Sequence, residues 1–164
     1  MKKLSVFIAV LVGMGILAGC GSKRSQAYYD QKSQVLSANY DGSYVIRTQV
    51  RSRNSALAFN EAQRKAVEEV IFDGVKSASS GVTDLKPLCF DLNAREKYET
   101  YFQAFFSDEG DWTQFVSLRD KRAGSTRYQR TTSQMVQTVT VTVQRAELKK
   151  RLQADGIIPM EGRY

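Results

Sequence analysis

Histidine is absent from this chain of 164 residues, and cysteine and proline occur only twice each. A chain without histidine has no histidine-based catalytic triad, no imidazole general base and no histidine-ligated metal. Two cysteines are also too few to form a zinc site from cysteine alone. The sequence thus excludes these familiar hydrolase and metalloenzyme sites, and we expect no enzyme activity, no catalytic residues, no metal and no other cofactor.

The composition is that of an ordinary globular protein. Hydrophobic residues make up 42% of the chain and charged residues 25%, which predicts one domain and excludes a disordered or collagen-like chain. The formal net charge of +7 favours anionic partners if the compartment supplies them.

The N-terminus has the pattern of a secretory signal peptide. A short basic segment, Met1-Lys2-Lys3, precedes an apolar run from Leu4 to Leu17. This run is shorter than the roughly 20 residues that a membrane-spanning helix needs. The run ends in Leu17-Ala18-Gly19-Cys20, which resembles the lipobox of bacterial lipoproteins. Two other interpretations remain open, namely an uncleaved membrane anchor and a buried N-terminal helix.

The lipoprotein resemblance implies a processed and acylated protein. Signal peptidase would recognise Leu17, Ala18 and Gly19, cleave after Gly19, and leave Cys20 bonded to diacylglycerol and further acyl groups such as palmitate. The mature chain would have 145 residues and a formal charge of +5, from 22 Lys and Arg against 17 Asp and Glu. Because each buried methylene contributes about 0.8 kcal/mol, two or more acyl chains anchor a protein permanently.

Cys89 would then have no intramolecular disulfide partner. It lies in the apolar segment Leu88-Cys89-Phe90, so we expect a buried, unreactive thiol. A reactive or intermolecular Cys89 is the alternative.

The residues after Cys20 bear on the compartment. In lipoproteins of the enterobacterial type, an aspartate directly after the lipidated cysteine marks retention in the inner membrane, whereas Gly21 stands here and Lys23 and Arg24 follow. The resemblance thus implies an outer-membrane protein that faces the periplasm. In that compartment we expect neither nucleic acid nor a small-molecule substrate as a partner.

The sequence predicts four successive segments. Residues 1–19 form the signal peptide, residues 20–42 the lipidated cysteine and a flexible tether, residues 43–158 the domain, and residues 159–164 a tail. A tether of about 20 residues has a root-mean-square span of roughly 25 Å. A short helix over residues 27–37 is an alternative to the tether.

Hydrophobic periodicity predicts the first elements of the domain. Residues 43–51 alternate as a strand, with Tyr44, Ile46, Thr48 and Val50 on its buried face. A helix capped by Asn54 or Ser55 follows, and its buried stripe is predicted to contain Phe59, Ala62, Ala66, Val67, Val70, Ile71 and Val75. The opposite side is predicted to be a solvated face with the pairs Glu61–Lys65, Arg64–Glu68 and Lys65–Glu69. Residues 77–81 are expected to form a loop, and residues 85–92 an edge strand or an extended connection.

The second half is predicted to contain two helices and two strands. Asn93 and Glu96 indicate the start of a helix with Tyr98, Tyr101, Phe102 and Phe105 on one face as core residues, although residues 98–106 also fit a strand. Residues 112–118 and 127–143 are predicted strands joined by a basic loop, and residues 146–154 a helix that Gly156 ends. The expected fold is α+β: a two-layer domain whose mostly antiparallel sheet has two or three helices packed on one face.

Two segments resemble known envelope proteins. The strand and helix of residues 44–75, with Ala62-Gln63-Arg64-Lys65-Ala66-Val67, and the strand and helix of residues 139–157 are similar to the N-terminal domain of flagellar assembly protein T and to related small outer-membrane lipoproteins. These segments cover about 50 of the 145 mature residues, and residues 85–130 do not match the resemblance.

The favoured function is a non-enzymatic assembly or bracing component of an envelope-spanning machine, such as a type VI secretion system or a flagellar or motility apparatus. Its partners would be the membrane, through the lipid, and other envelope proteins. Candidate docking residues lie in the basic loop and the strand after it: Lys121, Arg122, Arg127 and Arg130. An ordinary solvated hairpin also explains these residues.

Two other functions remain open. A peptidoglycan- or anionic-lipid-binding lipoprotein would use the positive charge, and its binding to sacculi would weaken as salt rises. An envelope-polymer hydrolase would need two carboxylates about 5 to 9.5 Å apart, and Glu99, Asp108 and Asp111 are candidates. The acidic turn with Asp108, Glu109 and Asp111 supplies too few oxygen ligands to favour calcium.

Overall fold

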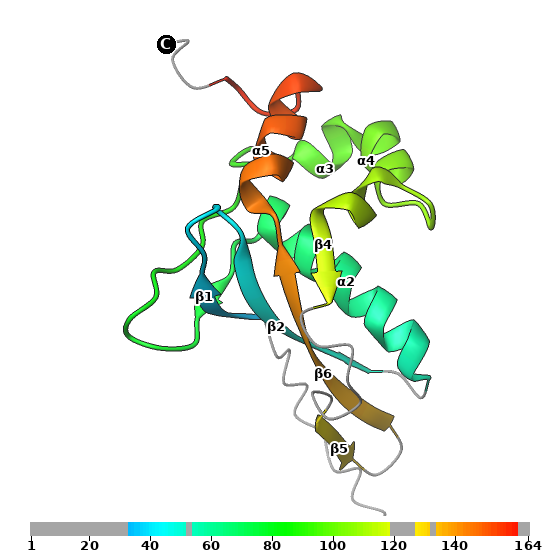
Figure 1. Ribbon diagram of the computed structural model, residues 1–164. Coiled ribbons are helices and arrows are strands. Elements are labelled where there is room, and N and C mark those ends of the chain that lie inside the picture. Colours follow the sequence, from blue (N-terminus) through cyan, green and yellow to red (C-terminus); the bar gives the residue numbers. More distant parts are fainter. Residues whose placement is uncertain (1–32, 52–53, 119–126, 132–133, 161–164) are drawn as a thin grey trace, which may run out of the picture. The chain divides into compact units, whose positions relative to one another are not determined.

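A computed structural model describes residues 33–51, 54–118, 127–131 and 134–160, which all fall within one compact unit (Figure 1). This part of the chain has the predicted α+β fold. Six strands form one sheet: β1 (Gln34–Ala38), β2 (Tyr44–Arg51), β3 (Lys76–Ser77), β4 (Val116–Leu118), β5 (Arg127–Thr131) and β6 (Gln134–Val143). The helices are α2 (Ser55–Phe72), α3 (Ala94–Lys97), α4 (Glu99–Phe105) and α5 (Arg145–Ala154), with a 3-10 helix, η1 (Asp111–Phe115).

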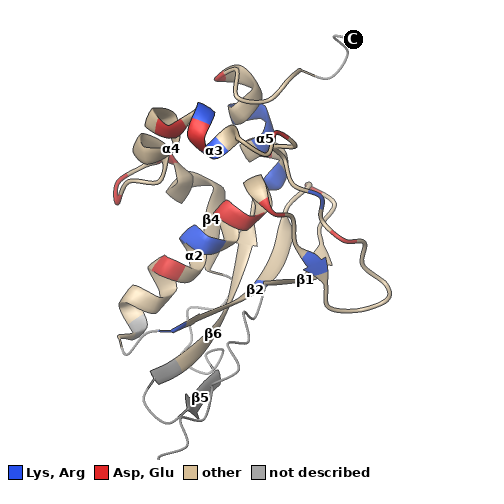
Figure 2. Ribbon diagram, turned by 180° about the vertical axis from the view of Figure 1, so that it is seen from behind, with Lys and Arg blue, Asp and Glu red and all other residues tan. Residues whose placement is uncertain are grey.

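The sheet is antiparallel except at one edge. Its strand order is β3-β1-β2-β6-β4, and β5 pairs with β6 as well. Only β1 and β3 run parallel to each other. Helix α2 lies across one face of the sheet, in front of β2 and β6 when the molecule is seen from behind (Figure 2). The predicted layering of helix on a mostly antiparallel sheet is therefore confirmed.

The two central strands have the predicted alternation. The register places Ile46 opposite Val141 and Thr48 opposite Val139, and all four side chains are buried. Facing residues of paired strands project from the same face of the sheet. This face therefore forms the floor of the core, as predicted. Val45 is buried as well, so burial in β2 is not confined to one face.

Helix α2 begins at the predicted cap and presents the predicted stripe. The side chain of Asn54 accepts a hydrogen bond of 2.9 Å from the backbone N–H of Ala56. Five members of the stripe are fully buried: Ala62, Ala66, Val67, Val70 and Ile71. Val75 is buried but lies beyond the helix, where it forms a bridge with Leu85. The helix ends earlier because Gly74 adopts a φ of 74°, a conformation that closes helices.

The predicted tether is too long, because strand β1 lies inside it. Val35 is fully buried opposite Ile46, so the domain begins near Ser33 rather than at residue 43. The alternative helix over residues 27–37 is also wrong for residues 34–37, which are strand. The pairing of β1 with β2 shifts between Val35 and Ser37. Such a bulge breaks the alternation by which a strand is recognised in a sequence.

Residues 94–105 are helical, but they form two short helices with a break at Tyr98. The strand alternative for residues 98–106 is therefore wrong. Asn93 precedes α3 without capping it through its side chain. Phe102 and Phe105 are buried, and Tyr98 and Tyr101 pack against the core, so the predicted role of these aromatic residues is confirmed.

The predicted strand pair of residues 112–118 and 127–143 needs correction. Only Val116–Leu118 is strand, and it pairs with β6. Trp112 and Phe115 are both buried in η1, at the three-residue spacing of a 3-10 helix rather than the two-residue spacing of a strand. Residues 127–143 contain two strands, β5 and β6, which pair with each other. The alternation changes phase at this break, because the register places odd-numbered residues of β5 beside even-numbered residues of β6, as it does Arg127 and Thr138. The sequence did not reveal the change because Tyr128 is the only apolar residue of β5.

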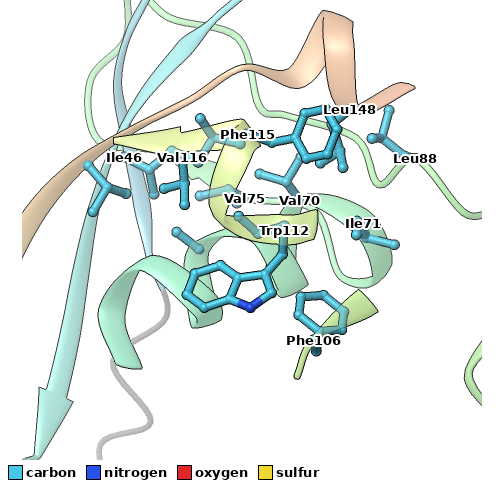
Figure 3. Close-up of a cluster of buried hydrophobic side chains, with 14 of the residues drawn as sticks. Ile46, Val70, Ile71, Val75, Leu88, Phe106, Trp112, Phe115, Val116 and Leu148 are labelled. Atoms are coloured by element: carbon cyan, nitrogen blue, oxygen red, sulfur yellow. The ribbon is translucent and has the colours of Figure 1, made fainter. Parts of the chain in front are cut away.

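The core lies between α2, the sheet and the 3-10 helix (Figure 3). Trp112 lies among Val70, Ile71 and Phe106 in this view, and its indole N–H donates to the carbonyl of Ser107 at 2.8 Å. At the end of the domain, α5 buries Leu148 and Leu152 as predicted. Gly156 has a φ of 72°, and the N–H of Ile157 donates to the carbonyl of Leu152 at 2.9 Å, so the predicted helix stop is confirmed.

Replacing Gly110 with alanine is expected to destabilise the domain by about 2 kcal/mol or more. A Cβ atom there would lie 2.9 Å from the carbonyl oxygen of Ala104 and closer still to that of Phe105, and backbone atoms cannot move aside cheaply. Gly81 is the control, because a Cβ there meets nothing within 4 Å. Urea unfolding should show a lower midpoint for Gly110→Ala alone, and equal midpoints for the two variants would contradict the prediction.

Candidate docking surface

Most of the predicted functional residues lie outside the described part of the chain. This applies to Cys20, to Leu17, Ala18 and Gly19, and to Lys121 and Arg122. Arg127 and Arg130 lie in β5, where the backbone register pairs them with Thr138 and Met135, but their side chains are not described. Their roles in lipidation and docking therefore stay predictions.

Charge is unevenly distributed over the described elements. None of the strands in this part of the chain contains Asp or Glu, whereas they contain five basic residues: Arg47, Arg51, Lys76, Arg127 and Arg130. The acidic residues lie in the helices and connections (Figure 2). This segregation depends on which segments join the sheet, so the predicted basic loop by itself does not reveal it.

The side of the two central strands that faces away from the core, here called the outer face, is polar. It consists of Val45, Arg47, Gln49 and Arg51 of β2 and Val136, Thr138, Thr140 and Thr142 of β6. Arg47 lies opposite Thr140 and Gln49 lies opposite Thr138. Both arginines are exposed and the threonines are half-buried. Within the described residues, Arg47 makes no ion pair.

The outer face is suited to binding and has no arrangement of reactive groups among its described residues. A guanidinium presents several N–H donors in a rigid plane and pairs well with carboxylates. Threonine side chains in a sheet are stiff and offer a hydroxyl that donates and accepts. Together the exposed arginines and the half-buried threonines form a positively charged surface with hydrogen-bonding groups, although Val45 and the side-chain oxygen of Gln49 are buried.

A buried polar cluster lies at the point where the described chain enters the sheet. Ser33 is only 1% exposed, and its hydroxyl donates to the hydroxyl of the buried Thr48 at 3.0 Å. Burial raises the pKa of the nearby Glu69, although hydrogen bonds from Ser33 and the charge of Lys65 oppose the shift. The Nζ of Lys65 lies 3.8 Å from the Glu69 carboxylate. Ser33 thus joins β1 to both β2 and α2.

This cluster corrects the prediction that the charged side of α2 is only a solvated face. The predicted Lys65–Glu69 pair is present, but Glu69 is largely buried. Glu68 pairs with Arg95 of α3, and Arg64 lies over the ring of Phe106. Helix periodicity identifies neighbours within one helix and cannot identify partners from other elements.

Replacing Glu69 with glutamine is expected to remove a pH dependence of stability. Because the folded pKa of Glu69 lies above its unfolded value, the folded state holds the proton more tightly. This stabilisation is complete below the unfolded pKa and is lost as pH rises through the folded pKa. The midpoint of thermal unfolding should decline less from pH 4 to 8 for Glu69→Gln than for the unaltered chain. Gln63→Glu is the control variant. An unchanged decline for Glu69→Gln would show that other groups cause the pH dependence of stability.

The three candidate catalytic carboxylates each have different surroundings on the surface of the described chain. Glu99 accepts a hydrogen bond from Gln103 at 2.9 Å, and Asp108 is exposed in a turn. Asp111 accepts one from Arg151 at 2.7 Å, and Arg151 also binds Asp155 at 2.7 Å. Asp111 therefore takes part in a contact that joins η1 to α5. No group of three metal-ligating side chains is found within residues 33–51, 54–118, 127–131 and 134–160.

Cys89 is buried as predicted. Burial, with a smaller effect from the charge of Asp91, raises the pKa of its thiol. A raised pKa lowers the fraction of the reactive thiolate, which is consistent with an unreactive Cys89.

No helix within the described ranges is long and apolar enough to span a membrane. Comparison with protein-family models finds no match to this chain, and no curated protein or solved structure matches it either.

Proposed function

We propose that this protein is a lipid-anchored, periplasm-facing component of the outer membrane. In this proposal it acts without enzymatic activity, as an assembly or bracing part of an envelope-spanning machine. The observation that carries the proposal is the sequence Leu17-Ala18-Gly19-Cys20 at the end of a short apolar run that follows Lys2 and Lys3. A secretion apparatus such as the type VI system, or a flagellar or motility apparatus, is the class of machine proposed.

The position of β1 supports a bracing role. Residues 21–32 separate Cys20 from Ser33, and a fully extended chain of that length spans at most about 40 Å. Ser33 is bonded to Thr48 and lies against Glu69. A force acting through the lipid would reach the central strand and the longest described helix, because Ser33 contacts both. The outer face supports the role as well, since it offers exposed arginine side chains to another protein.

Crosslinking in intact cells tests this proposal. A tagged chain should be recovered, after mild crosslinking and solubilisation of the envelope, with the same few envelope proteins in repeated preparations. The Cys20→Ala variant is the control and should lose these partners, because it lacks the anchor that places the domain beside them. Recovery of no envelope protein with the unaltered chain would contradict the assembly role.

A further inference from the structure

We infer that the outer face docks an acidic surface of a partner protein. This inference rests on the proposed function and names the chemistry of the partner. The face meant is that of Arg47, Gln49 and Arg51 on β2 and of Thr138, Thr140 and Thr142 on β6.

Charge complementarity is the first argument. The outer face carries arginine and no acidic residue, and the acidic residues of the described chain lie in other elements. Arg47 is exposed and has no ion-pair partner among the described residues. A surface with one sign of charge attracts the opposite sign and repels a second copy of itself. The partner surface is therefore acidic and is not the same face of a second copy.

The side-chain types of the face favour a protein over the other anionic partners. Glycans and single-stranded nucleic acids stack on aromatic rings, and proteins that lie on membranes insert Trp, Phe or Leu. The described outer face has no such residue, since its only apolar side chains are Val45 and Val136. Arginine and threonine instead match the carboxylates and amides of a protein surface.

The neighbour of Arg47 adds to the match. Thr140 lies opposite Arg47 in the register and provides a hydroxyl beside it, so a carboxylate bound by Arg47 can also accept a hydrogen bond from Thr140.

A binding measurement with the full acylated chain in nonionic detergent tests the inference. The probe is a fluorescent oligoglutamate peptide, and its anisotropy reports binding at two salt concentrations. Arg47→Glu should weaken binding of the peptide roughly fivefold, and Thr140→Glu should also weaken it. The matched control is Lys86→Glu, because Lys86 is exposed outside the strands and its reversal changes the net charge equally. Both outer-face variants should keep the thermal unfolding midpoint of the unaltered chain.

Three results would overturn the inference. Equal weakening by Lys86→Glu and Arg47→Glu would mean that net charge alone drives binding. Unchanged binding in both outer-face variants would place the contact elsewhere. Binding of phosphatidylglycerol vesicles or purified sacculi that depends on Arg47, without binding of the peptide, would assign the face to a lipid or glycan. The acylation of Cys20 is measured separately by mass spectrometry, so failure of this inference is distinguishable from failure of the proposed anchor.

Discussion

Replacement of Cys20 with alanine is expected to abolish lipid attachment and to keep the first nineteen residues on the protein. The thiol of Cys20 is the acceptor of the diacylglycerol in the lipoprotein family that this segment resembles, and alanine has no atom that can take its place. Because a single acyl chain gives only marginal membrane binding and two or more give stable anchoring, we expect the variant, which would have no acyl chain, to be absent from the outer membrane.

Two measurements check this expectation. Mass spectrometry of the unaltered product should give the mass of residues 20–164 plus the acyl groups, and the variant should give the mass of the whole chain. Density-gradient separation should find only the unaltered protein with the outer membrane. Cys89→Ala is the control, because Cys89 is buried and its replacement should leave acylation unchanged. An unmodified Cys20 in the native product would refute the anchor and the role proposed from it.

Replacement of Trp112 with alanine is expected to have the largest effect on folding. Trp112 is 2% exposed, so its removal leaves a large cavity between η1, α2 and Phe106 (Figure 3). Substitutions of this kind cost about 3–5 kcal/mol, which is a large part of the roughly 5–15 kcal/mol that stabilises a typical domain. The carbonyl of Ser107 also loses its hydrogen bond from the indole.

The measurement is urea unfolding followed by far-UV circular dichroism, because Trp112 is the only tryptophan and its fluorescence is lost with it. Leu57→Ala is the matched control. Leu57 is a large apolar residue of α2 but is 62% exposed, so its replacement should change the free energy of unfolding by about 0.5 kcal/mol or less. Similar midpoints for the two variants would show that Trp112 is not a core residue of this fold in solution.

The sequence predicted those elements whose pattern is local. Asn54 was one of two predicted caps for α2 because its side chain reaches a backbone N–H two residues away. The stripe from Ala62 to Ile71 was visible because one helix face is buried along its whole length. Leu148, Leu152 and Gly156 were found for the same reason.

The elements that the sequence missed depend on distant partners or on interrupted patterns. Strand β1 is short and contains a bulge. Val35 is its only fully buried residue, so its sequence has no clear alternation. The division of residues 127–143 into β5 and β6 reverses the phase of the alternation, but β5 contains only one apolar residue, Tyr128, that could reveal it. The polar cluster of Ser33, Thr48 and Glu69 joins residues far apart in the chain, so no local spacing predicts it.

The sequence by itself determined the α+β class, the main helix and its cap, the central strand and the buried state of Cys89. It also contains the segment Leu17-Ala18-Gly19-Cys20, whose resemblance to a lipobox is the basis of the proposed anchor. Only the tertiary structure decided where the domain begins, which strands are neighbours, and that the basic residues of the strands share a sheet without acidic ones. The physical reason is that periodicity reports which side of an element is buried, whereas strand pairing and contacts between elements depend on chain folding over long distances.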